Sequence, residues 1–464
     1  ARWWRHGVAE VAKTKGNAMS DRQIVMVGFL QAQNCSNYPA SWRHQESASD
    51  FLTPAYYGRI ARALEEGKFH LAFFDDRLAM PDIYGSDHAE SVRNGVRVVK
   101  MDPVPILATM AMGTKCLGLA ATCSTTYYGP FHIARTFMTL DHMTGGRAGW
   151  NVVTSLNDSE AFNMGAAGSI EHDRRYDRAD ELMRAVVDMW GAWDSDAIVH
   201  DKGGGVFADP AKVRRTQFDG EWFQTKGTFT VPPSPQGHPV IIQAGQSGRG
   251  RRFAVEWGEV IFTILTSLEQ GQQVRTAMRA EAESFGRDPD TITIAPAIYV
   301  TVGETQGIAE DKFAYIDALA KPIDGLALLS EALNFDFATK NMEDPFTDEE
   351  LDGINGLRGI LDRVIRLSGR PNPTLADFVE FSGRGTIREA PHFVGNPTQV
   401  ADKLEEWFVE GACDGYVLAA THMPGAYEEF ARYVVPELQR RGLYHWDYKG
   451  TTLRENLGLV GYLS

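Results

Sequence analysis

Residues 145–161, GGRAGWNVVTSLNDSEA, carry the pattern on which the fold assignment depends. A glycine-rich turn leads into the apolar run AGWNVVT (148–154), and a polar, turn-prone loop follows it at once. An apolar run of this length between turn residues is typical of a buried strand. An asparagine inside such a strand needs partners for its amide, either from the backbone or from a planar polar ligand. The stretch therefore predicts a buried strand that ends with Asn151 close to a polar loop.

Similar apolar runs recur along the chain, and helical patterns separate them. Apolar residues recur at spacings of three and four in most of the intervening segments, so each predicted helix has one face to bury. Strands that alternate with helices are typical of parallel β-α units, and eight such units predict a closed (β/α)8 TIM barrel of the α/β class. The predicted strands are 24–30, 70–76, 117–123, 148–154, 239–245, 259–265, 291–303 and 414–420.

The domain organisation follows from what does not fit a minimal barrel. Residues 1–21 are basic at the start and are expected to be a disordered leader or an addition outside the fold. The remaining chain is predicted to be one barrel domain over 22–441, followed by a C-terminal extension over 442–464. Insertions are expected at about 77–102, 194–238 and 305–395, and the last is long enough to be a helical, lid-like cover.

Charge and cysteine content narrow the class of protein. The 464 residues carry a formal charge of −15 at pH 7, and a negative field repels nucleic acid and anionic lipid. No apolar run is long enough to cross a bilayer. The four cysteines show no Cys-x-x-Cys spacing, which suits a reducing compartment. We therefore expect a cytoplasmic protein without nucleic-acid or membrane partners.

Polar residues follow the ends of the second and third predicted strands, where a barrel builds its active site. The second strand ends in Asp75, Asp76 and Arg77. Adjacent strand residues point to opposite faces, so one carboxylate at most enters the barrel mouth, as a general base or a ligand acceptor. An ion pair with Arg77, or a cap of the next segment, is an equal interpretation of the spacing. The third strand ends in Thr122 and a hydroxyl-rich, aromatic stretch, which suits a polar heterocycle.

The segment QAGQSGRGRRF (243–253) indicates a phosphate site after the fifth strand. Small residues before a helix let backbone N–H groups approach a phosphate, and the helix N-terminus adds favourable partial charge. The segment matches neither a dinucleotide fingerprint nor a Walker loop. Arginine side chains are available to assist, although at least two are expected to face solvent or a carboxylate; they are Arg249, Arg251 and Arg252.

A second cluster, EHDRRY (171–176), opens a predicted helix. Asp173 is expected to cap that helix. His172 and Tyr176 are four residues apart, so they share one helix face if the helix begins early enough, and they can then approach a phosphate from the other side.

Metal and serine chemistry are disfavoured. The sequence holds no His-Glu-x-x-His, no histidine pair at ligand spacing and no cysteine cluster, so redox work requires an organic cofactor and no metal is expected. A Gly-x-Ser-x-Gly elbow is also absent, which disfavours a serine hydrolase.

Several long motifs resemble the bacterial-luciferase-like, FMN-dependent monooxygenases. The resemblance is to the branch of nitrilotriacetate, EDTA and dibenzothiophene-sulfone monooxygenases, and it is strongest to the sulfone enzymes. It covers residues 22 to 458 and is weakest over 305–390. The motifs are GGRAGWNVVTSLNDSEAFNMG, EHDRRYDRADEL, GVFADPAKV, SPQGHPVIIQAGQSGRGRRFA and YKGTTLRENLGL.

The resemblance implies a two-component monooxygenase. Reduced FMN comes from a separate NADH-dependent flavin reductase and reacts with O2 to give a flavin peroxide, which attacks the substrate. The implied substrate is an apolar aromatic, such as a sulfone that loses a C–S bond or a halogenated aromatic. Homodimers or homotetramers are the usual assembly. Carried over by motif, the FMN contacts fall on Asp76, Thr122, His172, Tyr176 and Ser247, with Asn151 a further candidate beside the isoalloxazine ring.

Other assignments stay open. Within the fold, an aminopolycarboxylate monooxygenase or a deazaflavin-dependent oxidoreductase is the alternative. A flavin carrier or a hydrolase that uses Asp75 or Asp76 as its base is the alternative from another class. No catalytic base is assigned. The candidate pocket residues, for which core packing is an equal interpretation, are Phe74, Cys35, His44 and His132.

Overall fold

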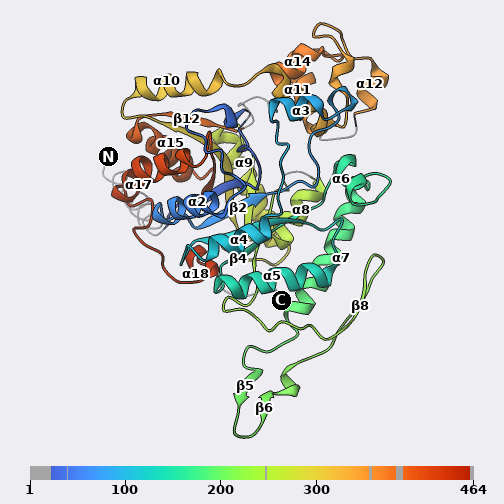
Figure 1. The fold of residues 1–464 in the computed structure, drawn as a ribbon, viewed down its shortest axis with the longest axis vertical. Helices are drawn as coiled ribbons and strands as arrows, with labels where there is room; N and C mark the ends of the chain where they lie inside the picture. Colours follow the sequence, from blue (N-terminus) through green and yellow to red (C-terminus); the bar gives the residue numbers. More distant parts are fainter. Residues whose placement is uncertain (1–21, 39, 246–247, 355–357, 383–389, 460–464) are drawn as a thin grey trace, which may run out of the picture.

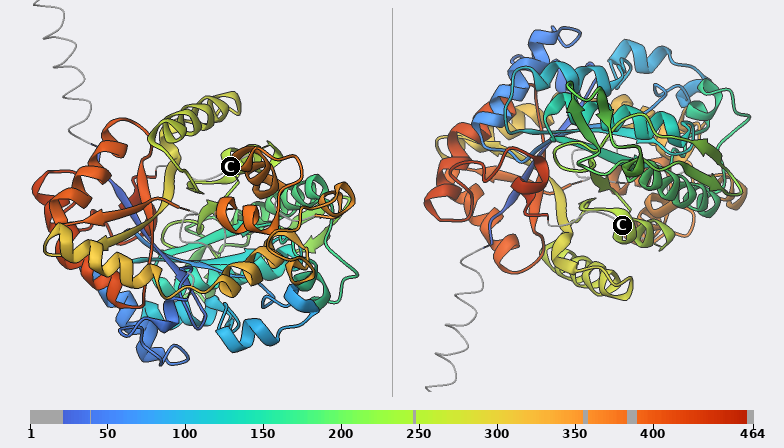
Figure 2. Two further views of the ribbon diagram at one scale, coloured as in Figure 1. Left: turned by 90° about the horizontal axis from the view of Figure 1, so that it is seen from above. Right: turned by 90° about the horizontal axis from the view of Figure 1, so that it is seen from below.

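The computed structural model describes residues 22–38, 40–245, 248–354, 358–382 and 390–459. Within them, parallel strands close into a barrel surrounded by helices (Figure 1, Figure 2). The order around the ring is β1, β2, β3, β4, β9, β10, β11 and β13, and β13 pairs with β1. The predicted (β/α)8 TIM barrel is confirmed.

Each barrel strand overlaps a predicted run. One further strand, β12 (His392–Gly395), was not predicted. It pairs with Tyr299–Val302 of β11, and β13 pairs with Ala297–Tyr299, so β11 is long enough to pair with two strands along one edge while β10 pairs with the other. The barrel strands are β1 (Val25–Gln31), β2 (Leu71–Asp75), β3 (Gly118–Ser124), β4 (Ala148–Val153), β9 (Val240–Gln243), β10 (Val260–Thr263), β11 (Thr293–Val302) and β13 (Gly415–Ala419).

Helices follow the strands as predicted, and local sequence explains where they begin. Asp102 accepts a hydrogen bond from the Val104 amide at the start of α4, and Asn396 does the same for the Gln399 amide at the start of α15. The outer helices are α2 (Pro54–Glu66), α4 (Pro103–Ala111), α5 (Pro130–Thr144), α7 (His172–Trp190), α8 (Gly248–Trp257), α9 (Leu268–Ser284), α15 (Pro397–Val409), α16 (Gly425–Glu429), the π-helical turn Phe430–Val434 and α17 (Val435–Arg440).

Alternate strand residues fill the barrel interior. Phe29, Phe73 and Phe262 contact one another there, with ring centroids 5.3, 5.4 and 6.2 Å apart. Because side chains alternate along a strand, the next inward positions towards the carboxyl ends lie directly above this aromatic layer. The aromatic layer therefore forms the floor of the barrel mouth.

The C-terminal segment closes the opposite, amino end of the barrel. Leu453 of α18 (Leu453–Leu457) is buried in the interior cluster of the barrel. Next to it, Arg454 Nη1 donates to Glu259 Oε1 over 2.6 Å, and both side chains are buried. A buried pair of this kind must stay intact, because one partner alone would leave an uncompensated charge.

Three segments extend beyond the barrel. Residues 77–102 hold α3 (Ala89–Asn94). Residues 194–238 form two antiparallel hairpins, and β5–β6 projects from the body at the end opposite α11, α12 and α14 (Figure 1). The third segment packs a hydrophobic cluster of its own around Phe337, Phe346 and Phe378. Helix α6 (Asp158–Asn163) lies outside these segments, between β4 and α7. The further elements of the three segments are β5 (Ile198–Asp201), β6 (Val206–Ala208), β7 (Thr216–Asp219), β8 (Gln224–Gly227), α10 (Gln306–Asp317), α11 (Pro322–Leu333), α12 (Asp348–Asp352), α13 (Arg358–Ser368) and α14 (Leu375–Phe381).

Short 3₁₀ turns complete the secondary structure, at Ser41–Arg43, Tyr84–Ser86, Pro210–Lys212, Pro289–Thr291 and Phe337–Thr339. Within the described ranges, no helix has the length and apolarity required to cross a bilayer.

Candidate active site

Four neighbouring strands place polar residues at the carboxyl end of the barrel. Gln31 of β1 is in register with Asp75 of β2, and Thr122 of β3 is in register with Asn151 of β4. Gln31 lies two residues beyond Phe29 on its strand, and Asp75 lies two beyond Phe73. By strand alternation these side chains share the face of the aromatic floor. The barrel mouth thus has an aromatic floor beneath a polar edge.

Trp150 and Asn151 of the strand that decided the fold point to opposite faces. Trp150 is fully buried outside the barrel, against Phe137 and Trp190, and its Nε1 donates to the Cys123 carbonyl over 3.1 Å. It packs the strand against the helices. Asn151 faces the mouth.

The amide of Asn151 is held in one orientation but only half satisfied. Its Nδ2 donates to Thr122 Oγ1 over 2.8 Å, and that hydroxyl donates to the Phe74 carbonyl over 2.8 Å. The Oδ1 atom is buried and has no partner among the described residues. A buried acceptor without a partner is costly, so a ligand that donates a hydrogen bond here stabilises the site.

Gln31 was missed in the sequence. It is 4% exposed, and neither Nε2 nor Oε1 has a hydrogen-bond partner among the described residues. The available signal was its phase, since it follows Val27 and Phe29 at a spacing of two on a buried strand. Both orphaned amides offer edge contacts to a flat polar heterocycle.

A cavity of about 500 Å³ opens beside these strand ends. It brings together Asp76 and Thr122, two predicted cofactor contacts, and His132, a predicted pocket residue. The His132 ring stacks on Tyr128, with centroids 5.5 Å apart. Other lining residues include Leu78, Met80, Val98, Lys100, Met101, Asp102, Val104, Cys123, Ser124, Val153, Ser155 and Glu160.

Asp76 is the cavity's unusual acid. Burial raises the pKa of the Asp76 carboxyl above its ordinary range, while the Lys100 ammonium acts in the opposite direction. The carboxyl therefore keeps its proton to higher pH than an exposed aspartate and can donate as well as accept a hydrogen bond.

The two predicted phosphate segments do meet. The His172 and Tyr176 rings touch, with centroids 5.2 Å apart, and a β-carbon added at Gly250 in α8 would lie 2.6 Å from Tyr176 Oη. Burial raises the pKa of Tyr176, and a hydrogen bond with Thr154 opposes that shift. Glycine thus lets the start of α8 approach the hydroxyl of Tyr176. Ser247, just before α8, lies outside the described residues.

The arginines near α8 all have other partners, although the buried Nη1 of Arg249 has none among the described residues. Arg249 pairs with Asp180, Arg251 Nε donates to Glu281 Oε2 over 2.8 Å, and Arg252 lies over the ring of Phe285. The first turn of α7 also differs from expectation, because Glu171 rather than Asp173 accepts from the Arg174 amide as the helix cap. Asp173 instead contacts His172 Nδ1.

Two predicted pocket residues lie away from the cavity. Phe74 is fully buried in the layer between barrel and helices, where it packs near Tyr57. Cys35 is buried beside Gln33, and burial raises the pKa of its thiol, which disfavours a reactive thiolate.

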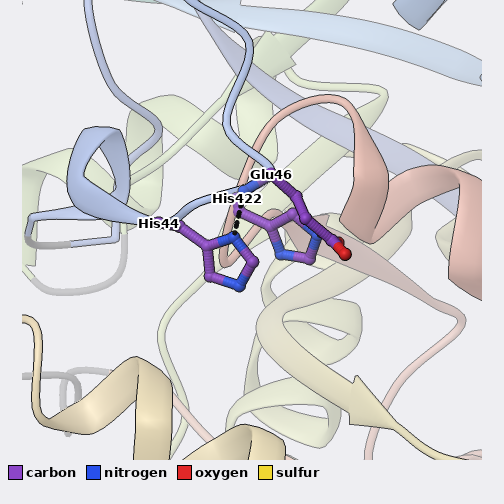
Figure 3. A group of neighbouring side chains, drawn as sticks. All are labelled: His44, Glu46 and His422. Carbon is purple, nitrogen blue, oxygen red and sulfur yellow. Dashed lines mark hydrogen bonds and ion pairs between the residues drawn. The ribbon is translucent and has the colours of Figure 1, made fainter.

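His44 also lies elsewhere, in a group with Glu46 and His422 (Figure 3). Their nitrogen and oxygen atoms lie within 4.8 Å of one another. The two imidazoles are stacked, with centroids 4.0 Å apart and planes at 11°. A metal lies in the plane of each imidazole that binds it, and stacked rings share no such point. His44 Nδ1 already accepts from the Glu46 amide over 3.1 Å, which leaves Nε2 for a metal. Because the rings are stacked, joint coordination would require one of them to turn.

Comparisons with known proteins decide the family. The model of the family described as luciferase-like monooxygenase matches residues 34–415. The chain belongs to this family. This luciferase-like monooxygenase is 43% identical over 447 residues to the dibenzothiophene-sulfone monooxygenase of Rhodococcus erythropolis, which covers 94% of this chain and 97% of the relative. It is 34% identical to nitrilotriacetate monooxygenase component A of Aminobacter aminovorans, over 95% of this chain and 98% of the relative.

A solved structure adds a cofactor. Riboflavin lyase, crystallised with modified FMN and its substrate riboflavin, is similar to this luciferase-like monooxygenase with a TM-score of 0.85 at 31% identity. The match covers 94% of this chain and 96% of the other. The chain is therefore an oxidoreductase of the monooxygenase type, and its relatives indicate a flavin cofactor. The orphaned amide of Asn151 and the glycine approach at Tyr176 fit such a group at its ring and phosphate ends.

Proposed function

We propose that this protein is the oxygenase of a two-component system, which uses reduced FMN and O2 to oxygenate an apolar aromatic molecule. The substrate class is an aromatic sulfone, with cleavage of a C–S bond, or a halogenated aromatic. One observation carries the proposal: a buried, orphaned amide oxygen on Asn151, at the mouth of a barrel whose relatives act as monooxygenases. Bound reduced FMN would supply the electrons that activate O2.

Different residues would contact the ring and the phosphate of FMN. Asn151, locked by Thr122, would accept from the flavin ring, and Asp76 would contact the polar ring edge. His172, Tyr176 and Ser247 would hold the phosphate with the N-terminus of α8. Thr154, which bonds Tyr176, is three residues after Asn151, a span of roughly 10 Å along an extended chain. That span suits a ribityl chain between ring and phosphate.

The helical segment after β11 would exclude water from the site. Its helix α11 reaches three loops at the barrel's carboxyl end. Asp324 accepts from Arg43 over 2.6 and 3.0 Å, and Glu331 accepts from Arg77 over 3.2 Å and from Asn157 over 3.4 Å. A dry site protects activated oxygen from discharge and positions the substrate.

The cavity favours an aromatic substrate over an aminopolycarboxylate. Its apolar lining and stacked Tyr128 and His132 rings suit a flat ring. A polyanionic chelator would need several free cations, whereas the lining offers only Arg77 and Lys100, and Glu331 already engages Arg77. A relative named as component A supports a reductase partner, from which reduced FMN arrives by transient contact or diffusion. We propose a cytoplasmic homodimer or homotetramer as the working form.

The test supplies reduced FMN from an unrelated NADH:FMN reductase under ¹⁸O2 and offers dibenzothiophene sulfone, a chlorinated phenol and nitrilotriacetate in parallel. The expected result is one labelled oxygen atom in an aromatic product, detected by mass, and none with reductase alone. Labelled product from the chelator only would move the assignment to aminopolycarboxylates. Tighter binding of a deazaflavin than of FMN, without labelled product, would replace oxygenation by hydride transfer.

A further inference from the structure

Five aspartate, glutamate, lysine and arginine side chains line the cavity beside the strand ends, and three of them already have structural roles. Asp102 caps α4, with Oδ1 accepting from the Val104 amide over 2.9 Å. Glu160 accepts from the amides of Leu78 and Asn157, over 3.1 and 3.4 Å. Arg77 is paired with Glu331. Asp76 and Lys100 are therefore the groups that remain for a ligand.

The Lys100 ammonium has few hydrogen-bond partners in the protein. Its ammonium donates to Gln33 Oε1 over 3.2 Å, and no carboxylate of the described residues lies within 4.0 Å of it. An ammonium has three donors, so capacity for two more hydrogen bonds remains. Lys100 is also half-buried, and a cation withdrawn from water without a counter-ion is unfavourable.

The electrostatic surroundings favour an incoming anion. Burial lowers the pKa of Lys100, the Arg97 guanidinium lowers it further, and Glu331 opposes both. Asp76, the acid of the cavity that has no structural role described above, keeps its proton to raised pH because burial disfavours its charged form. Protonated Asp76 carries no charge and does not neutralise the Lys100 ammonium. An anion bound at Lys100 would supply the missing negative charge.

The remaining lining residues indicate the shape and polarity of the rest of that ligand. Tyr128 and His132 form a stacked pair with ring planes at 17°, and Met101, Val104 and Ile133 add apolar surface. We propose that Lys100 binds an anionic oxygen group of the substrate, a carboxylate, sulfonate or phenolate, while the substrate's aromatic ring lies against Tyr128 and His132. The aromatic acid as oxygenation substrate rests on the proposed function; the binding subsite itself does not.

The same ammonium would also suit an oxygen of the flavin ring, because Asp76 and Thr122 line the same cavity. To decide whether Lys100 binds the substrate or the flavin, the affinity for each is measured in the absence of the other. Calorimetry with 2-naphthoate and 2-naphthamide compares an anion with a neutral molecule of the same shape, and quenching of flavin fluorescence gives the FMN dissociation constant. Both readouts are independent of turnover.

The variants are Lys100→Met, which keeps the aliphatic stem, Lys100→Arg, which keeps the charge, and Lys115→Met, an exposed lysine outside the cavity. The wild-type protein should bind naphthoate more tightly than naphthamide. Lys100→Met should weaken naphthoate about tenfold or more and leave naphthamide and FMN unchanged, since a charged hydrogen bond contributes that much. Lys100→Arg should keep most of the preference, and Lys115→Met all of it.

Equal affinity of the wild-type protein for acid and amide would overturn the proposal. Loss of FMN affinity with naphthoate affinity intact in Lys100→Met would overturn it too, by assigning Lys100 to the flavin. Should naphthoate bind as described while no substrate is oxygenated in the reduced-FMN assay, the proposed function fails and the anion subsite stands.

Discussion

Asn151 shows how a single polar side chain can be set for a ligand by its neighbours. The Thr122 hydroxyl donates to the Phe74 carbonyl and accepts from the Asn151 amide, so the amide cannot turn without losing its hydrogen bond to Thr122. Its oxygen therefore faces the mouth in a fixed orientation, buried and without a partner among the described residues. Preorganised acceptors of this kind bind better than mobile ones, because less ordering is needed on binding.

Replacing Asn151 by alanine should weaken FMN about tenfold or more, because it removes the buried acceptor. Replacing Thr122 by valine should have a smaller effect in the same direction, since the acceptor remains but loses its anchor. Titration of FMN fluorescence measures both, and the matched control is Asn341→Ala, at an exposed asparagine of the helical segment. Unchanged FMN affinity in a folded Asn151→Ala protein would remove this residue from the site.

At the scale of the elements, α11 joins the helical segment to a barrel loop through an ion pair, in addition to the packing of α10 on β11 and β12. The Arg43–Asp324 pair is nearly buried, with side-chain exposures of 13% and 2%, and Asp324 also accepts from the Lys321 amide. Ion pairs at the surface contribute little, whereas loss of one partner from a buried pair leaves a charge uncompensated. Attachment of α11 therefore depends strongly on Arg43.

Arg43→Ala should loosen the helical segment by about 3 kcal/mol or more, since Asp324 would be left buried without its cation. Hydrogen exchange of the α11 amides should accelerate while the barrel strands stay protected. Reduced FMN should then release more hydrogen peroxide per product formed, because water reaches the site. Arg93→Ala breaks an exposed pair with Glu90 and should change neither readout. Uniform acceleration across barrel and α11 would argue against a local attachment.

The whole molecule keeps several histidines neutral by burying them. Burial, with Arg454 nearby, lowers the pKa of His238 to about 4. Burial alone lowers the pKa of His392 to about 3, and burial with His44 lowers that of His422 to about 3. Asp141 acts in the opposite sense, since burial raises its pKa to about 6. Acid sensitivity is therefore distributed over the fold and does not belong to the active site alone.

Unfolding free energy should fall as pH drops from 6.5 towards 4. In that window the histidines bind protons in the unfolded state but not in the folded state. Each such histidine lowers the free energy of unfolding by about 1.4 kcal/mol per pH unit. Protonation of Asp141 in the folded state offsets part of this loss. These four groups together should lower the unfolding free energy by about 4 kcal/mol between pH 6.5 and 5, and the raised pKa of Asp76 offsets a further part of that loss. Urea unfolding at pH 7.5, 6.5 and 5 measures it, and His392→Gln should reduce the slope. Equal stability at pH 6.5 and 5 would contradict these shifted values.

Local sequence was sufficient for much of this architecture. The barrel strands were predictable because a strand buried on both faces is an uninterrupted apolar run between turn residues, as in 148–154. His172 and Tyr176 were placed on one face because a spacing of four is one helical turn. In contrast, β12 is a four-residue strand inside a segment expected to be helical, and it exists because β11 is long enough to pair with it.

Closure of the barrel determines which side chains of each strand face its interior, and no local sequence pattern does so. Strand phase sends Trp150 outward into packing and Asn151 inward to the mouth, but which phase faces inward depends on the neighbours that close the ring. Only the tertiary structure shows that Gln31 and Lys100 are candidate ligand contacts. The missing partners of the Gln31 amide and the single hydrogen bond of the Lys100 ammonium depend on which groups surround them in space. Periodicity is a property of consecutive residues, whereas burial and hydrogen-bond satisfaction arise between segments that are far apart in the chain.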